Sequence, residues 1–214
     1  NLLLSRPGWS RELVDAVASG RVAADLIPPD MVDPLVHARD PGLRERAAQV
    51  FRSKVRTASV APDRLAEVER ILKQAPGNPY AGEALFAERC AGCHKLFFKG
   101  GQVGPDLTAY QRDNLGTLLT SIVNPNAEIR EGYAAVEITT RDGRVLVGFL
   151  RDRDTRVAVL RGLDGQDVTL LMADVESIEP TGRSLMPEGL LDGWTDDQLR
   201  DFFAFLRSSQ PFTR

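Results

Sequence analysis

The chain has 214 residues, a formal net charge of −3 and only two cysteines. This length suffices for one or two domains with a hydrophobic core. The sequence contains no basic stretch of the kind that binds nucleic acid, and no apolar run approaches the length of a membrane-spanning helix.

The first part of the chain, residues 1–78, is predicted to be helical. Ser10 is expected to cap one helix, and Asp40 is expected to cap another that has Pro41 at its first position. Residues 75–79 (Ala-Pro-Gly-Asn-Pro) have the composition of a linker. Short amphipathic helices in series indicate the end of an α-solenoid of HEAT-like repeats, although no clean period is visible.

The helical pattern returns over residues 80–131. Gly82, Phe86 and Cys90 are spaced by four, so they share one face of a helix. A second helix is predicted from Asn114 to Val123, where apolar residues recur with the helical period.

The period changes to two after Tyr133. Apolar residues alternate with polar ones in several short runs, and Asp142-Gly143 is a strong hairpin signal. About five short strands over residues 132–181 predict a small antiparallel barrel or rolled sheet.

A final helix is predicted after this β segment. Thr195 and Gln198 form a capping box, and large apolar residues line one face of the helix. The predicted fold is therefore mainly α with a β insertion. Three parts are expected: a helical segment (1–78), a helical domain (79–214) and, within it, the inserted β module (132–181).

The most informative motif is Cys90-Ala-Gly-Cys93-His94, which contains both cysteines of the chain and one of its two histidines. The pattern C-x-x-C-H is the attachment motif of c-type haem. Two thiols three residues apart in a helical turn can each form a thioether with one vinyl group of a haem. The next residue, His94, then supplies the proximal imidazole to the iron. The motif predicts one covalent haem c and redox chemistry.

Two other interpretations of the cysteine pair are weaker. A zinc site needs two further ligands, but no other cysteine exists and the only other histidine, His37, lies far upstream. A thioredoxin-like dithiol site lies between a strand and a helix, whereas here a helical pattern precedes the motif and a Gly-rich loop follows it.

A sixth iron ligand is expected from methionine sulfur, for which Met31, Met172 and Met186 are the candidates. An isolated methionine is usually core filler. Met186 differs because it lies on an irregular loop beside proline and glycine. Leaving out residues 132–181 also brings it to a separation from His94 that suits a compact cytochrome loop. We therefore favour Met186 over the other methionines and His37.

Several other residues are candidates for supporting roles. Pro105, in Gly104-Pro105-Asp106-Leu107, is placed to accept a hydrogen bond from His94 through its carbonyl, or it forms an ordinary turn. Gly82 is expected to allow close approach of the last helix near Phe202 or Phe205, or it is simply a residue of its own helix. Four residues are candidates for contacts with the haem propionates, but a solvated or packing role is favoured for each of them: Arg112, Arg130, Arg183 and Trp194.

These motifs carry a resemblance to a known family. Residues 80–131 and 182–208 resemble the small single-haem cytochrome c fold. More narrowly, about the last 135 residues resemble the haem-binding domain of Pirellula/Verrucomicrobium type, which tolerates such a β insertion. The matching segments are Val103-Gly-Pro-Asp-Leu-Thr108, Ile122-Val-Asn-Pro-Asn126, Gly132-Tyr133, Asp142-Gly143 and Ser184-Leu-Met-Pro-Glu-Gly-Leu190. Phe205 departs from the tyrosine common in the last helix.

The resemblance implies an electron-carrying module that is not itself an enzyme. It would pass single electrons from a fused or partner dehydrogenase, and residues 1–78 would end a set of helical repeats. Haem is joined to this motif outside the bacterial cytoplasm, yet Asn1 to Arg6 do not form a signal peptide. We therefore expect a piece of a longer exported, periplasmic protein.

Three alternative functions remain. In a haem-based sensor or gas-binding module, Met186 would be displaced by the ligand. A peroxidase would need distal acid–base groups, for which the sequence offers only His37. In the third, which is compatible with electron transfer, the β insertion acts as a docking module while the haem carries electrons.

Overall fold

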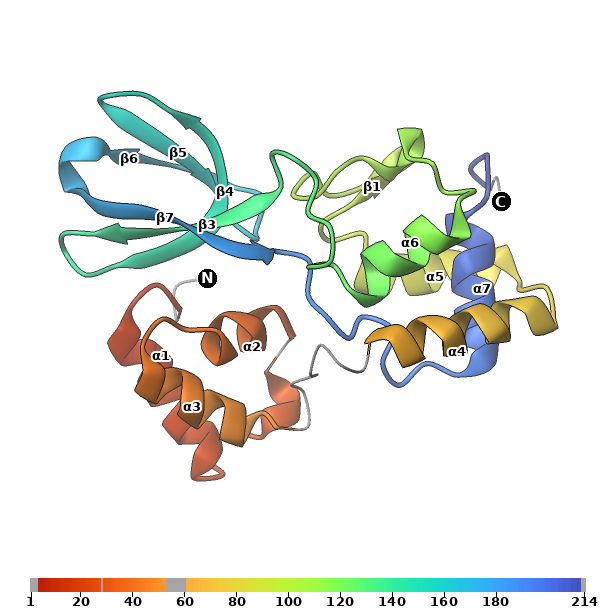
Figure 1. The fold of residues 1–214 in the computed structure, drawn as a ribbon, viewed down its shortest axis with the longest axis horizontal. Helices are drawn as coiled ribbons and strands as arrows, with labels where there is room; N and C mark the ends of the chain where they lie inside the picture. The colour runs from red at the N-terminus through yellow and green to blue at the C-terminus, as the bar shows by residue number, and fades with distance from the viewer. Residues whose placement is uncertain (1–3, 28, 53–60, 213–214) are drawn as a thin grey trace. The chain divides into compact units, whose positions relative to one another are not determined.

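A computed structural model describes residues 4–27, 29–52 and 61–212 (Figure 1). Residue contacts group the chain into two compact units. The first unit contains residues 1–56 and 129–187, and the second contains residues 57–128 and 188–214. The division at residue 78, and the reading of residues 132–181 as an insertion in a haem domain, stay predictions.

The helices of the first unit surround one apolar core. They are α1 (Pro7–Ala18), the short η2 (Ala24–Leu26), α2 (Pro29–Val36) and α3 (Pro41–Val50). The core residues are Val14, Val17, Ile27, Val32, Leu35, Val36, Leu43, Ala47 and Phe51. Burial of these side chains stabilises the packing of helices that are each too short to be stable alone. This arrangement does not support the prediction that these helices are the end of an α-solenoid.

The helix caps test two expectations from the sequence. The cap at Asp40 is confirmed, since its carboxylate accepts hydrogen bonds from the Gly42 and Leu43 amides and Pro41 occupies the first turn. The cap at Ser10 is wrong. Helix α1 begins earlier, at Pro7, because proline has a φ that suits the first helical position, and Ser10 is buried inside the helix.

The first unit also contains the predicted five strands, all antiparallel. They are β3 (Ala134–Thr140), β4 (Val145–Arg153), β5 (Val157–Arg161), β6 (Asp167–Leu171) and β7 (Val175–Ser184). A short helix, η5 (Met172–Asp174), joins the last two. The chain therefore changes from helical to strand structure where the pattern changes period.

Of the two predicted forms, a barrel or a rolled sheet, the closed barrel is wrong. The strand order is β6-β5-β4-β3-β7, so β6 and β7 are the two edges of an open sheet within the described residues. The sheet has a core of its own, formed by Ile138, Ala158, Leu160, Leu170 and Val175. Because the described pairing ends at β6 and β7, each keeps one unpaired side in this sheet.

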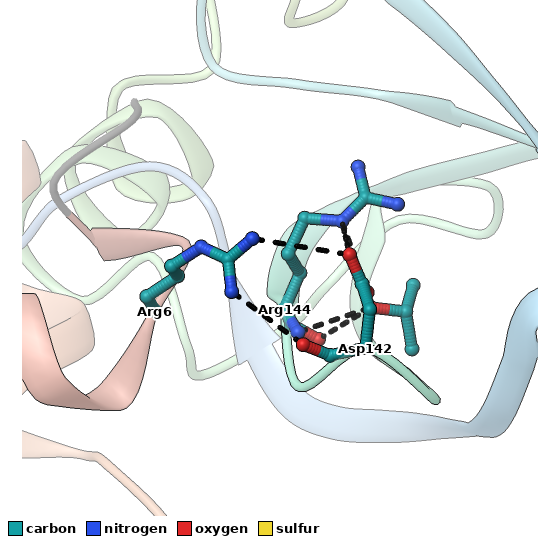
Figure 2. A network of polar contacts seen from close by, with 4 residues as sticks. Arg6, Asp142 and Arg144 are labelled. Atoms are coloured by element: carbon teal, nitrogen blue, oxygen red, sulfur yellow. Dashed lines mark hydrogen bonds and ion pairs between the residues drawn. The ribbon is translucent and has the colours of Figure 1, made fainter.

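Residues 5 and 6 are attached to the β3–β4 turn. The Val145 amide donates to the Ser5 carbonyl oxygen at 2.7 Å. Figure 2 shows Arg6 and Arg144 beside Asp142. Arg6 Nη2 lies 3.9 Å from Asp142 Oδ2, and Arg144 Nε lies 3.0 Å from the same oxygen. Gly143 provides the positive φ, +80°, that the turn requires. Residues 5 and 6 therefore belong structurally with the sheet.

The second unit combines helices with a small hairpin. Its elements are α4 (Ala61–Gln74), α5 (Pro79–Arg89), β1 (Lys95–Leu96), β2 (Lys99–Gly100), η4 (Leu107–Ala109), α6 (Leu115–Val123) and α7 (Asp196–Leu206). The capping box is confirmed, since Thr195 Oγ1 accepts from the Gln198 amide and Gln198 Oε1 accepts from the Thr195 amide. Helices α5 and α7 pack against each other (Figure 1). Across the residues described, no helix is long and apolar enough to cross a membrane.

Candidate functional site

The C-x-x-C-H motif forms a tight turn at the end of α5. Helix α5 begins after Asn78, whose side chain accepts from the Tyr80 amide, and Cys90 caps its C-terminal end. The amides of Cys93 and His94 both donate to the Cys90 carbonyl oxygen, at 3.1 and 2.9 Å. Backbone hydrogen bonds thus hold the two thiols and the imidazole on one turn.

The His94 ring is oriented by Pro105. Nδ1 of His94 lies 3.0 Å from the Pro105 carbonyl oxygen, so the ring donates there in the Nδ1–H tautomer. Burial lowers the pKa of His94 below its usual value, against the opposing effect of this hydrogen bond. The imidazole is therefore neutral at neutral pH, and its Nε2 carries the lone pair that a metal ion needs.

Two glycines allow this close packing. A Cβ on Gly104 would lie 2.5 Å from His94 Cε1, and a Cβ on Gly100 would lie 2.1 Å from the His94 carbonyl oxygen. Gly100 also has a φ of +118°, which other residues rarely adopt. The Gly104 amide donates to the Cys93 carbonyl oxygen at 2.9 Å. Sequence reasoning missed Gly100, although the Gly100-Gly101 pair after the motif was a signal for close backbone contact.

Helix α7 covers the helix that leads into the motif. A Cβ on Gly82 would lie 2.0 Å from the Asp201 carbonyl oxygen and 2.8 Å from Phe205 Cβ, which confirms the predicted close approach of the last helix. The Phe86 and Phe205 rings lie 5.5 Å apart between their centroids. The helix that leads into the motif is thus supported by an apolar crossing with α7.

The alternative metal and thiol chemistries gain no support. The described part of the chain contains no group of three or more His, Cys, Asp and Glu residues that could hold a metal ion, so a zinc site has no further ligands there. Burial, and then the neighbouring Cys93, raise the pKa of the Cys90 thiol to about 12. A thiol of this kind is not the reactive thiolate of a dithiol oxidoreductase.

The three methionines have different surroundings. Met31 packs against the helical core of the first unit, and Met172 packs against the core of the sheet. Met186 belongs to neither core. It is half-buried, lies two residues after the end of β7, and its amide donates to Ser184 Oγ at 3.1 Å. By residue range Met186 belongs to the first unit and His94 to the second.

The remaining candidates have protein partners or are exposed. His37 Nδ1 lies 2.9 Å from the Asp33 carbonyl oxygen. Arg112 is buried and donates to the carbonyl oxygens of Leu206 and Ser208, both at 2.7 Å. Trp194 stacks under Arg89, and Arg183 pairs with Asp33, whereas Arg130 is exposed. These contacts agree with the packing roles favoured for Arg112 and Trp194.

The donor set of the turn fits a haem c. Two thiols and a neutral imidazole lie on one turn, and the ring nitrogen that faces away from Pro105 is the one a metal would use. Residues 80–155 match the family model for cytochrome c, and a search of curated proteins gives no match. This match supports a cytochrome c and implies covalent haem c, with iron, as the cofactor. It also indicates a haem-binding module of an electron-carrier family that has redox partners.

Proposed function

We propose that the cytochrome c region of this chain carries single electrons, and that Cys90, Cys93, His94 and Met186 hold its haem. The observation that supports this most is the turn that places both thiols beside an imidazole already oriented by Pro105. Bound haem supplies an iron that alternates between the ferric and ferrous states.

The chain's own residues supply attachment, orientation and packing. Cys90 and Cys93 would form the two thioethers, and Pro105 holds the His94 ring in one tautomer, which favours one ring nitrogen as the ligand. Gly104 lets the loop lie flat against that ring. The crossing of α5 and α7 buries Phe86 and Phe205 beside the helix that leads into the turn. A rigid ligand set of this kind suits an electron carrier, because little reorganisation accompanies each transfer.

Met186 is our choice for the residue that would provide the second protein ligand to the iron. Its two competitors pack against hydrophobic cores, and His37 is hydrogen bonded to Asp33. Met186 lies on an irregular loop held by Ser184. A thioether at this position would raise the reduction potential relative to a second imidazole.

The proposed setting is a periplasmic or otherwise exported bacterial protein. In it this module would accept electrons from a fused or partner dehydrogenase and would not catalyse a reaction of its own. The resemblance to the haem-binding domain of Pirellula/Verrucomicrobium type supports this setting.

We expect one covalent haem per chain when the protein is produced with a haem-attachment system. Mass spectrometry of the denatured protein should show the mass of one added haem, and neither thiol should react with an alkylating reagent. The Cys90→Ala, Cys93→Ala double variant should carry no covalent haem. Free thiols or bound zinc in the purified wild-type protein would contradict the proposal.

Met186→Ala should abolish the weak near-infrared absorption band that an iron–methionine sulfur bond gives in the oxidised protein. The matched variants Met172→Leu and Met31→Leu should retain it, because those side chains fill cores. If Met186→Ala keeps the band, another methionine is the ligand. Rapid binding of carbon monoxide by the reduced wild-type protein would favour the gas-binding alternative.

A further inference from the structure

The segment that carries Met186 is fixed to the sheet at its start. Thr181 Oγ1 donates to the Ala135 carbonyl oxygen of β3 at 3.0 Å, and the Arg183 amide donates to Thr181 Oγ1 at 3.1 Å. Ser184, the last residue of β7, accepts a hydrogen bond from the Met186 amide through Oγ. The position of Met186 therefore depends on where the end of β7 is held.

The end of β7 is also tied to helix α2. Arg183 Nη2 lies 2.9 Å from Asp33 Oδ1, and the two side chains are only 26% and 28% exposed. His37 also contacts Asp33, with its Nδ1 3.3 Å from the same Oδ1 atom. Burial acts to raise the pKa of Asp33, but the hydrogen bond with His37 and the charge of Arg183 hold it below its usual value, so Asp33 is an anion at neutral pH.

This ion pair and the methionine loop border the same pocket. The pocket lies within the first unit and is lined by Asp33, His37, Arg183 and Ser184, and also by Leu185 and Pro187, the two neighbours of Met186. A second ion pair lines it too, between Arg39 Nε and Glu137 Oε1 of β3 at 3.0 Å. Of these two ion pairs, the Asp33–Arg183 pair is the one that involves the strand end from which the loop leaves.

We propose that Asp33 and Arg183 are positioning residues for Met186, because their ion pair fixes the end of β7 from which the methionine loop leaves. This inference rests on the proposed function, in which Met186 binds the iron. Removing one partner of a partly buried pair takes away the attraction between the two charges, which favours opening of the strand end. A displaced loop would hold the sulfur less often in its ligating position.

The test uses the holoprotein with Asp33→Asn and, as a second variant, Arg183→Gln. Each variant should weaken the iron–methionine band and lower the midpoint potential. Each should also raise the affinity of the oxidised protein for added imidazole about tenfold, which corresponds to a loss of 1.4 kcal/mol in the stability of the methionine-bound form. The mass of attached haem should be unchanged. Asp33→Glu keeps a carboxylate and should therefore retain much of the band. Glu137→Gln breaks the other ion pair in the pocket and should leave the band, the midpoint potential and the imidazole affinity unchanged.

The possible failures are distinguishable. If the wild-type protein lacks the iron–methionine band, the Met186 ligation fails and this inference falls with it. A wild-type band that both Asp33→Asn and Arg183→Gln retain at full strength, with unchanged imidazole affinity, overturns the positioning role alone. Equal effects of Asp33→Asn and Glu137→Gln would show general loosening of the unit and would also overturn it.

Discussion

Gly82→Ala should lower the free energy of unfolding of the holoprotein by about 3 kcal/mol, at the upper end of the usual cost of overpacking. The added methyl group would lie 2.0 Å from the Asp201 carbonyl oxygen, which is backbone and cannot move aside as a flexible side chain would. Helices α5 and α7 must therefore separate. Urea unfolding followed by far-ultraviolet circular dichroism measures the change.

The matched control is Gly116→Ala in α6, an exposed helical glycine of the same unit. A Cβ there would meet only Asn114 Oδ1, at 3.7 Å, which is ordinary contact. Alanine has a higher helix propensity than glycine, so this variant should be neutral or more stable by up to about 1 kcal/mol. Equal stabilities of Gly82→Ala and the wild-type protein would mean that the two helices do not cross as closely as described.

Arg112→Met should cost about 3 kcal/mol of stability, the scale for lost charged hydrogen bonds with buried partners left unsatisfied. The guanidinium is buried and donates to the carbonyl oxygens of Leu206 and Ser208, at the negative end of the α7 dipole. It also lies over the Phe97 ring, 5.2 Å from its centroid. Methionine keeps part of the packing volume but leaves those carbonyl groups without their donor.

Arg207→Met serves as the comparison, because Arg207 caps the same helix end with an exposed side chain. Its removal should change stability by less than about 1 kcal/mol, the size of an exposed dipole interaction. Urea unfolding of both variants separates the two cases. The interpretation would be wrong if the two substitutions had the same cost.

Local signals predicted the local parts of this structure. The change from a period of 3.6 to a period of two located the five strands, because side-chain alternation is set by the pleat itself. Asp40 and the Thr195–Gln198 pair were identifiable as caps because capping depends on a few neighbouring residues. The spacing of Gly82 and Phe86 marked the face on which α7 packs.

Long-range features could not be predicted in the same way. Whether β6 meets β7 to close a barrel depends on strand twist and edge pairing, which short patterns do not encode. Residues 1–56 group with the sheet, and their contacts with it include the ion pairs Arg6–Asp142 and Asp33–Arg183. These pairs join residues far apart in the sequence, which no local pattern encodes. Ser10 was misassigned as a cap because Pro7 provides an equally good and earlier start.

The pairing of β7 with β3 has a kinetic consequence. Strands β3 to β6 form successive hairpins, whereas β7 pairs with β3. Val175 therefore pairs with Thr140, although the whole of β4, β5 and β6 lies between them in the sequence. The entropy lost on closing a loop grows with its length, and non-local pairings form more slowly than hairpins. We therefore expect β7 to join the sheet last as the protein folds. The chain around Ser184 and Met186 would then become ordered only at the end of folding, after the turn that carries Cys90, Cys93 and His94 has formed from local contacts.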